Sequence, residues 1–324
     1  MSLPTLKALV HTMRYEAEGI ISVELRPASG DVTFPAFEAG SHIDLHLPNG
    51  LVRNYSLLNS TADSQRYVVG VLNDRRSRGG SRYIHEKLRV GTILPISAPR
   101  NNFSLHPGKH SVLLAGGIGV TPMLSMLRAL VVQGRSVDFI YCARSRKEAA
   151  FIADINEFSS VAGVQVSWHF NDEQGGLPDI KRLLAGYAAD TPLYSCGPAP
   201  MLAAFELACA ELGYANIHLE RFAAAPAEPL QAAASAEGYC VQLQRTGITI
   251  TVPPGMFLLD ALLAAGIEHD HSCKEGLCGA CETKVLAGEV DHQDSILTKS
   301  ERAANKTMMV CVSGCKQGPL VLDI

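Results

Sequence analysis

Four cysteines near the end of the sequence have the spacing of iron–sulfur ligands. Cys273, Cys278 and Cys281 form a C-x4-C-x2-C run, and Cys311 follows at a distance. This is the plant-type arrangement, in which four thiolates converge on the two irons of a [2Fe–2S] cluster. Structural zinc more often uses two C-x2-C pairs, and the sequence holds one. We therefore expect these four residues to ligate a [2Fe–2S] cluster.

The loop around the first three ligands suits an anionic cluster. Gly276 and Gly279 are permissive backbone positions, so the loop can wrap closely and aim N–H groups at the sulfurs. Cys315, four residues beyond Cys311, is the alternative fourth ligand. We favour Cys311 because it follows the apolar run 308–310, which is typical of a strand that ends at the cluster.

Two motifs in the first hundred residues can bind a flavin. In Arg53-Asn54-Tyr55-Ser56, the arginine can pair with a phosphate, the tyrosine ring can stack, and Ser56 can bond a ring nitrogen. Gly79-Gly80-Ser81 precedes a helix-like segment, so its N–H groups form an anion site at a helix start. A site for a terminal phosphate favours FMN over FAD. An ordinary strand and a flexible basic loop are the alternatives.

Two turns in the middle of the chain are typical of nucleotide binding. Gly116-Gly117-Ile118-Gly119-Val120-Thr121-Pro122 follows an apolar strand and precedes a helical run, with Pro122 placed as the first helical residue. The pattern is G-x-G-x-x-P, whereas the usual fingerprint ends in glycine. Cys196-Gly197-Pro198 ends a later strand in the same way, so we expect both turns at one edge of the sheet. A purely structural turn is the alternative.

Arg144 and Arg146 follow the second strand of the same region. Arg144 can meet the ribose or adenine of a dinucleotide, and a solvated surface arginine fits equally well. Either side chain could reach a 2′-phosphate, so these residues alone leave NADH and NADPH both open.

The elements that must position these residues divide the chain into parts. Residues 1–106 show short strands at 20–25, 42–47 and 67–72, which favour an antiparallel β-barrel for the flavin. Residues 107–224 alternate strands and helices, as expected of an α/β domain with a parallel sheet for the nicotinamide nucleotide. An Ala/Pro-rich linker is predicted at 225–238.

Residues 239–324 form the expected ferredoxin domain. Strands at 239–243 and 248–252 read as a hairpin, and residues 256–265 as a helix that ends at Gly266. With the cysteine loop behind them, these elements predict an α+β, β-grasp-like fold.

The composition of the 324 residues narrows the function further. The net charge is −4 and no basic stripe occurs, which argues against a nucleic-acid partner. No apolar run reaches about 18 residues and no signal peptide is apparent, so we expect neither a membrane span nor secretion. The nine cysteines do not form a disulfide framework, which favours the cytoplasm.

In this order the motifs resemble the phthalate dioxygenase reductase family, single-chain reductases that serve Rieske-type oxygenases. The resemblance spans the whole chain, and it implies FMN, NADH and a [2Fe–2S] cluster as cofactors. Its FMN phosphate site corresponds to Arg53, Gly79, Gly80 and Ser81, and its flavin-ring contact to Ser56. Its nicotinamide site corresponds to Gly117, Gly119, Thr121, Cys196, Gly197 and Pro198. Its stacking aromatic corresponds to Phe222.

The function implied by the resemblance is an NADH-dependent oxidoreductase that supplies electrons to a terminal Rieske-type aromatic-ring oxygenase or O-demethylase. A flavin is needed because hydride carries two electrons and the cluster accepts one. Ser56, Thr121, Cys196 and Phe222 are expected around the hydride transfer, with no nucleophilic role for Cys196. A reductase for a cytochrome or diiron hydroxylase, and a redox sensor without turnover, are the alternatives.

Overall fold

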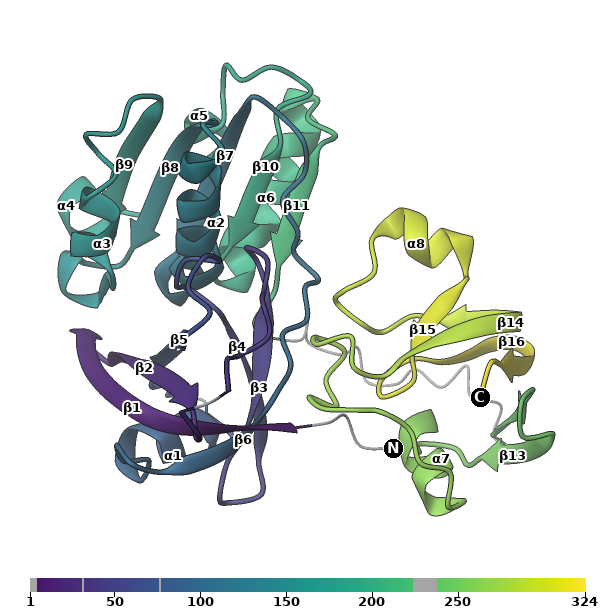
Figure 1. Ribbon diagram of the computed structural model, residues 1–324. Helices are drawn as coiled ribbons and strands as arrows, with labels where there is room; N and C mark the ends of the chain where they lie inside the picture. The colour runs from purple at the N-terminus through teal and green to yellow at the C-terminus, as the bar shows by residue number, and fades with distance from the viewer. Residues whose placement is uncertain (1–4, 31, 76, 224–237) are drawn as a thin grey trace. The chain divides into compact units, whose positions relative to one another are not determined.

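The computed structural model describes residues 5–30, 32–75, 77–223 and 238–324, which divide into two compact units (Figure 1). One unit is Thr5–Phe222, and the other begins at Ala223 and ends at Ile324. The linker predicted at 225–238 lies outside the described residues except for Gly238. In the described parts of the chain, no helix has both the length and the apolar character that a membrane crossing requires.

The first unit opens with a six-stranded antiparallel sheet in the order β4-β3-β6-β1-β2-β5. A bridge between Leu57 and Val69 brings the two end strands together, which curls the sheet into the expected barrel. Helix α1 follows β5. The bounds are β1 Thr5–Ala17, β2 Ile20–Pro27, β3 His42–His46, β4 Val52–Ser56, β5 Tyr67–Leu72, α1 Gly80–Glu86 and β6 Ile93–Ser97.

A parallel five-stranded sheet follows in the order β11-β10-β7-β8-β9. The chain builds β7, β8 and β9 in one direction and then returns to the other side of β7, so the order reverses between β7 and β10. The bounds are β7 His110–Gly116, β8 Ser136–Ala143, β9 Val164–Phe170, β10 Leu193–Cys196 and β11 Ile217–Glu220.

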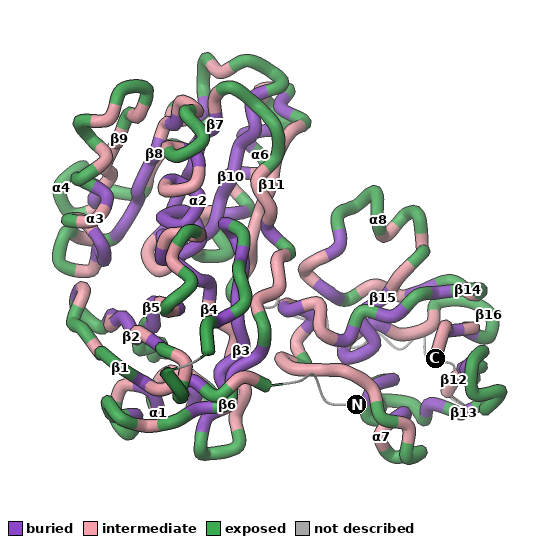
Figure 2. Tube along the Cα trace, viewed as in Figure 1, coloured by how far each residue is buried: buried purple, intermediate pink, exposed green. Residues whose placement is uncertain are grey.

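Helices cover both faces of this sheet, and the central strands are therefore buried on both sides (Figure 2). In β7, Leu113 and Ala115 pack toward α2, whereas Val112 and Leu114 pack toward α6. The helical segments are η1 Gly117–Gly119, α2 Val120–Val132, η2 Arg146–Glu148, α3 Ile152–Asn156, α4 Asn171–Gln174, α5 Ile180–Leu183 and α6 Ala199–Leu212.

The barrel and the parallel sheet share one hydrophobic core. Ala17, Ile20 and Leu58 of the barrel region are buried in the same cluster as Leu124 and Leu127 of α2. Because interiors are close-packed, this shared core fixes the two layers against each other.

The C-terminal unit contains a mixed sheet in the order β13-β12-β16-β14-β15, in which β12 and β16 are parallel. Helix α7 packs on this sheet, and a capping box of Thr298 and Glu301 begins α8. The predicted hairpin strands match β12 and β13. The bounds are β12 Tyr239–Leu243, β13 Ile248–Val252, α7 Leu258–Ala264, β14 Glu282–Asp291, α8 Lys299–Ala304, β15 Thr307–Met309 and β16 Gly314–Leu322.

One local expectation was wrong. Pro122 is the third residue of α2 rather than the first, because the turn η1 runs directly into a helix that begins at Val120. A proline is still tolerated there, since backbone N–H groups in the first helical turn have no partner within the helix.

Candidate functional site

The four predicted cluster cysteines come together in the C-terminal unit. Cys273, Cys278 and Cys281 lie in the loop before β14, and Cys311 follows β15. The thiol of Cys273 lies within hydrogen-bonding reach of those of Cys278 and Cys311, and the thiol of Cys281 within reach of that of Cys311. Among the described residues, no three or more His, Cys, Asp or Glu side chains surround a single ion position. These contacts link the four thiols in a chain, from Cys278 through Cys273 and Cys311 to Cys281, and four converging thiolates are what a two-iron centre requires.

Backbone N–H groups point at these sulfurs. Those of Glu275 and Leu277 lie 3.3 and 3.5 Å from the Sγ of Cys273. Ala280 donates to Cys278 and Gly276 to Cys311. Such donors stabilise the negative charge of thiolates and of a reduced cluster, so the residues present fit a [2Fe–2S] centre.

The shape of this loop depends on Gly276. Its φ is +67°, and a Cβ there would lie 2.7 Å from Cγ2 of Val312 and 2.9 Å from Cα of Asp294. Cys315 lies in β16, where its thiol donates to the carbonyl of Gly318 at 2.7 Å. The structure therefore brings Cys311 to the other three thiols and gives Cys315 a backbone partner.

The two predicted flavin motifs meet although 25 positions separate Arg53 from Arg78. Arg53 lies in β4 and donates to the carbonyl of Arg78, just before the glycine pair. A Cβ on Gly80 would lie 2.6 Å from Cγ of Arg53. Gly79, with φ +96°, is the N-cap of α1, and Ser81 accepts a hydrogen bond from the N–H of Asp74. A guanidinium and a helix start converge here, as a phosphate site requires.

The other end of the R-x-Y-S motif reaches the parallel sheet. Ser56 is buried, and its hydroxyl donates to Oε2 of Glu220 at 3.4 Å. Burial raises the pKa of the Glu220 carboxyl, and the hydrogen bond from Ser56 lowers it. Burial is the larger effect, and the pKa is about 8. Tyr55 is half-buried beside the barrel core, and burial raises its pKa.

Glu220 was missed by sequence reasoning. It ends β11 directly opposite Cys196 of β10 and lies two residues before Phe222. The available signal was an acidic residue at the end of a short strand that shares its sheet edge with the Cys-Gly-Pro turn. Phe222 is 42% exposed, which leaves its ring accessible to a ligand.

The two nucleotide turns touch at the edge where the strand order reverses. A Cβ on Gly119 would lie 2.2 Å from the carbonyl oxygen of Cys196, and one on Gly197 would lie 3.0 Å from Cα of Gly116. Parallel sheets bind their ligands at such a reversal, outside the carboxyl ends of the strands. Cys196 is fully buried, and desolvation keeps its pKa well above the ordinary thiol value, so its thiol is neutral.

Thr121 and the two predicted arginines have different surroundings. Thr121 is buried and donates to the carbonyl of Ile118 at 3.1 Å. The Arg144 side chain is 80% exposed and lies 3.7 Å from Glu148. Arg146 makes two bonds of 3.1 Å to Glu173, with its guanidinium 4.4 Å from the centre of the Phe170 ring. Arg146 is therefore engaged, and Arg144 is the more accessible of the two.

Two known protein families match this chain, one in its nucleotide-binding region and one in its cluster-binding region. Residues 113–206 match the oxidoreductase NAD-binding domain, and residues 241–316 match the 2Fe-2S iron-sulfur cluster binding domain. Phenoxybenzoate dioxygenase subunit beta of Ectopseudomonas oleovorans is 43% identical over 97% of this chain and 96% of its own length. Vanillate O-demethylase oxidoreductase of Pseudomonas sp. (strain HR199 / DSM 7063) is 40% identical over 98% of this chain and its entire length.

Solved structures agree along the length of the chain. Phthalate dioxygenase reductase superposes with a TM-score of 0.68 at 32% identity, covering 99% of this chain and 98% of that protein. An intact type IV self-sufficient cytochrome P450 monooxygenase superposes with a TM-score of 0.89 at 39% identity. This chain spans only 41% of that longer protein.

Fold, site and relatives define a class: reductases that carry a nicotinamide domain and a plant-type ferredoxin domain on one chain. The chain belongs to the phthalate dioxygenase reductase family. It is an NADH-dependent oxidoreductase of the type that serves oxygenase and demethylase systems, with FMN and a [2Fe–2S] cluster as its cofactors.

Proposed function

We propose that this chain delivers electrons from NADH to the Rieske centre of an aromatic-ring oxygenase or O-demethylase. The observation that carries this is its end-to-end correspondence with reductase components such as vanillate O-demethylase oxidoreductase. When bound, FMN supplies the conversion between a two-electron hydride donor and a one-electron iron–sulfur acceptor.

The chain's own residues bind and orient the flavin. Arg53, with the N–H groups and hydroxyl of Gly79, Gly80 and Ser81, holds the phosphate. With FMN bound, Tyr55 would pack along the flavin ring and Ser56 would hydrogen-bond it. Phe222, whose ring is exposed, would cover the flavin where nicotinamide must enter. The contact between Arg53 and Gly80 supports this assignment, because it joins both halves of the phosphate site.

The nicotinamide nucleotide lies along the two touching turns. Gly117, Gly119 and Thr121 would contact one side of the nucleotide. The other side would contact Cys196, Gly197 and Pro198. Arg144 contacts the adenosine end. Glu220 holds a proton on its carboxyl near neutral pH, next to the hydroxyl of Ser56, because its pKa is raised to about 8. The residue pair thus keeps the hydride-transfer site neutral.

In the C-terminal unit, Cys273, Cys278, Cys281 and Cys311 hold the cluster. We place the protein in the cytoplasm, where NADH is supplied and thiols stay reduced; the five cysteines outside the cluster are free thiols.

The test is anaerobic reduction of a purified Rieske oxygenase by NADH in the presence of this chain. Reduction of the Rieske centre that depends on both NADH and the chain is expected. Rapid bleaching of the chain's own flavin and cluster with no transfer to any Rieske oxygenase would contradict the partner assignment.

A haem partner is the second candidate, and the match to the self-sufficient P450 monooxygenase favours it. The same assay with a ferric P450 under carbon monoxide distinguishes the two. Faster formation of the ferrous carbonyl species than of the reduced Rieske centre would favour the haem partner.

A further inference from the structure

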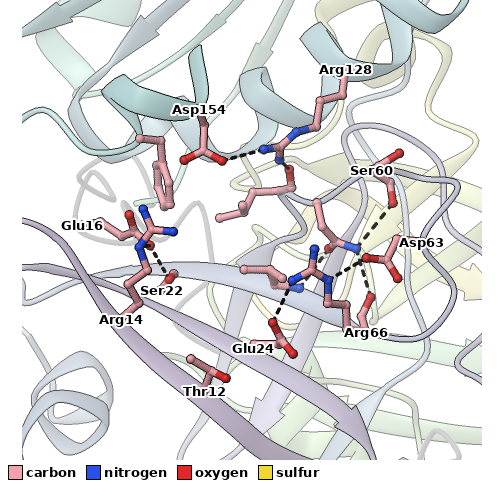
Figure 3. Close-up of a pocket in the computed structure, with 14 residues that line it drawn as sticks. Thr12, Arg14, Glu16, Ser22, Glu24, Ser60, Asp63, Arg66, Arg128 and Asp154 are labelled. Atoms are coloured by element: carbon pink, nitrogen blue, oxygen red, sulfur yellow. Dashed lines mark hydrogen bonds and ion pairs between the residues drawn. The ribbon is translucent and has the colours of Figure 1, made fainter. Parts of the chain in front are cut away.

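A polar cavity of about 370 Å³ lies between the barrel and the first helix of the parallel-sheet layer (Figure 3). Arg14 and Glu16 of β1 line it from the barrel, with Asp63 and Arg66 from the loop after β4. Arg128 of α2 and Asp154 of α3 line it from the other layer. The cavity thus marks where the flavin-binding and nucleotide-binding parts of this unit meet.

Arg128 bonds to both layers. Its guanidinium donates to the carbonyl oxygen of Leu58 in the barrel region and, at 2.8 Å, to Oδ1 of Asp154. Its side chain is only 19% exposed. A largely buried guanidinium with two acceptors is costly to remove, because the acceptors would be left without this partner.

Two further residues of α2 contact the barrel on the same side. The Thr121 methyl lies so close to Gly70 of β5 that a Cβ on Gly70 would be 2.6 Å from it. The Ser125 hydroxyl donates to the carbonyl of Asn59 at 3.4 Å. Positions 121, 125 and 128 are spaced by four and three residues, which places them on one face of a helix. One face of α2 therefore lies along the barrel.

At both ends, this face of α2 contacts segments that carry residues of the proposed hydride-transfer site. The helix begins at Val120, directly after the turn η1, and Thr121 is its second residue. The carbonyls bonded by Ser125 and Arg128 belong to Asn59 and Leu58, which follow Ser56 closely in the chain. The helix is thus a rigid connection between the residues proposed for the nicotinamide and those proposed for the flavin.

We propose that Arg128 is a positioning residue for hydride transfer: by holding Leu58 to α2 and α3, it fixes Ser56 and the flavin edge against the nucleotide turn. Transfer between two bound rings depends steeply on their separation, and a misplacement of about 1 Å can cost about 100-fold in rate. Arg128 touches neither ring, so its loss should slow transfer while NADH still binds. The inference rests on the proposed function.

The matched control is Arg66, which lines the same cavity. Its ion pairs, 2.6 Å to Asp63 and 2.8 Å to Glu24, stay within the barrel. Replacing Arg66 by methionine removes a cavity arginine of the same size without removing the bond between the layers.

The experiment compares wild type, Arg128→Met, Arg128→Lys and Arg66→Met, each loaded with FMN and cluster. Stopped-flow mixing with NADH gives the limiting rate of flavin bleaching and the Kd for NADH. Amide hydrogen exchange of residues 57–60, measured without NADH, reports the anchoring of the loop independently of activity.

For Arg128→Met we expect the limiting rate to fall about 10-fold or more, with the Kd changed less than about 3-fold. Exchange at 57–60 should speed up. Arg128→Lys should give an intermediate rate, and it decides the question if Arg128→Met does not fold. Arg66→Met should match wild type in all three measurements.

Two results would overturn the proposal. One is a limiting rate within about twofold of wild type in Arg128→Met, or in Arg128→Lys if only that variant folds. The other is a limiting rate in Arg66→Met that falls as far as in Arg128→Met. The effect would then belong to the cavity as a whole. A wild-type protein whose flavin NADH does not reduce would instead contradict the proposed function.

Discussion

At the scale of single residues, the sites differ in what gives each side chain its chemistry. The cluster thiols depend on one another and on the N–H groups of their loop. Glu220 depends on desolvation, which keeps a carboxyl protonated where an exposed one would ionise. In both cases neighbours supplied by the fold decide what the residue type can do.

Cys311 and Cys315 should respond differently to replacement. Cys311→Ser removes one of the four proposed cluster ligands, a thiol that lies next to those of Cys273 and Cys281, so the visible absorption of the cluster should be lost. NADH should still bleach the flavin of this variant, because the flavin and nicotinamide residues are untouched. The measurement is the visible spectrum combined with NADH-dependent reduction of cytochrome c.

Cys315→Ser is the control, since this thiol bonds the carbonyl of Gly318. It should keep both the cluster spectrum and cytochrome c reduction. Loss of the cluster in Cys315→Ser with retention in Cys311→Ser would reverse the ligand assignment.

Glu220 should make stability depend on pH. Its folded-state pKa is about 8 and its ordinary value is 4.5, so between these values the folded protein holds a proton that the unfolded chain has lost. The stability that Glu220 contributes is therefore fully present below the ordinary pKa and falls as pH rises through about 8.

The glutamine of Glu220→Gln cannot ionise. The thermal midpoint of this variant minus that of wild type should therefore increase as pH rises from about 5 to about 8. A gain of about 2–4 °C corresponds to about 1 kcal/mol in a domain of this size class. Thermal unfolding of both proteins across this range gives the answer. A constant difference between the two midpoints would show that Glu220 does not titrate in this window.

At the scale of elements, the short helical segments after β8 and β9 set what the nucleotide end of the sheet can recognise. Arg146 of η2 is held by Glu173 of α4 and by the Phe170 ring. An arginine held in this way is less available for a 2′-phosphate, and the neighbouring carboxylate repels one. This pairing gives a physical reason for NADH as donor.

Glu173→Gln should therefore improve the use of NADPH. Releasing one partially exposed ion pair and removing one like charge predicts about a 3- to 10-fold rise in kcat/KM for NADPH. The kcat/KM for NADH should change little. Steady-state rates with each nucleotide test this, and Glu211→Gln, which removes the exposed ion-pair partner of Lys181, is the matched control. If Glu173→Gln keeps the wild-type preference for NADH over NADPH, Arg146 does not contribute to the choice of nucleotide.

At the scale of the whole molecule, charge shapes the encounter with the partner only mildly. Residues 239–324 contain ten acidic and seven basic residues, a net charge of −3 before the cluster is counted. We expect electron transfer to the true oxygenase to slow about two- to fivefold as ionic strength rises from about 10 to about 300 mM. A stopped-flow salt series measures it, and a flat rate would exclude electrostatic docking.

Local patterns predicted most of the elements. The glycine turns, the strands at β5, β12 and β13 and helix α6 are recognisable from short-range rules, because turn chemistry and periodicity act over a few residues. The 13-residue β1 and the long β14 and β16 were not singled out, since much of each strand is exposed and lacks clean alternation. Edge exposure and pairing partners come from tertiary contacts, which a local pattern does not contain.

The sequence by itself determined three kinds of site: the cluster ligands, recognised by the spacing of their cysteines, the two flavin motifs and the two nucleotide turns. Each of these is a local run of residue types. Tertiary structure decided which of them meet. It separated Cys311 from Cys315, joined Arg53 to Gly80, and placed Glu220 beside Ser56 across 164 positions of chain. Contacts at that range depend on strand order and on close packing of layers, and these are properties of the folded chain as a whole.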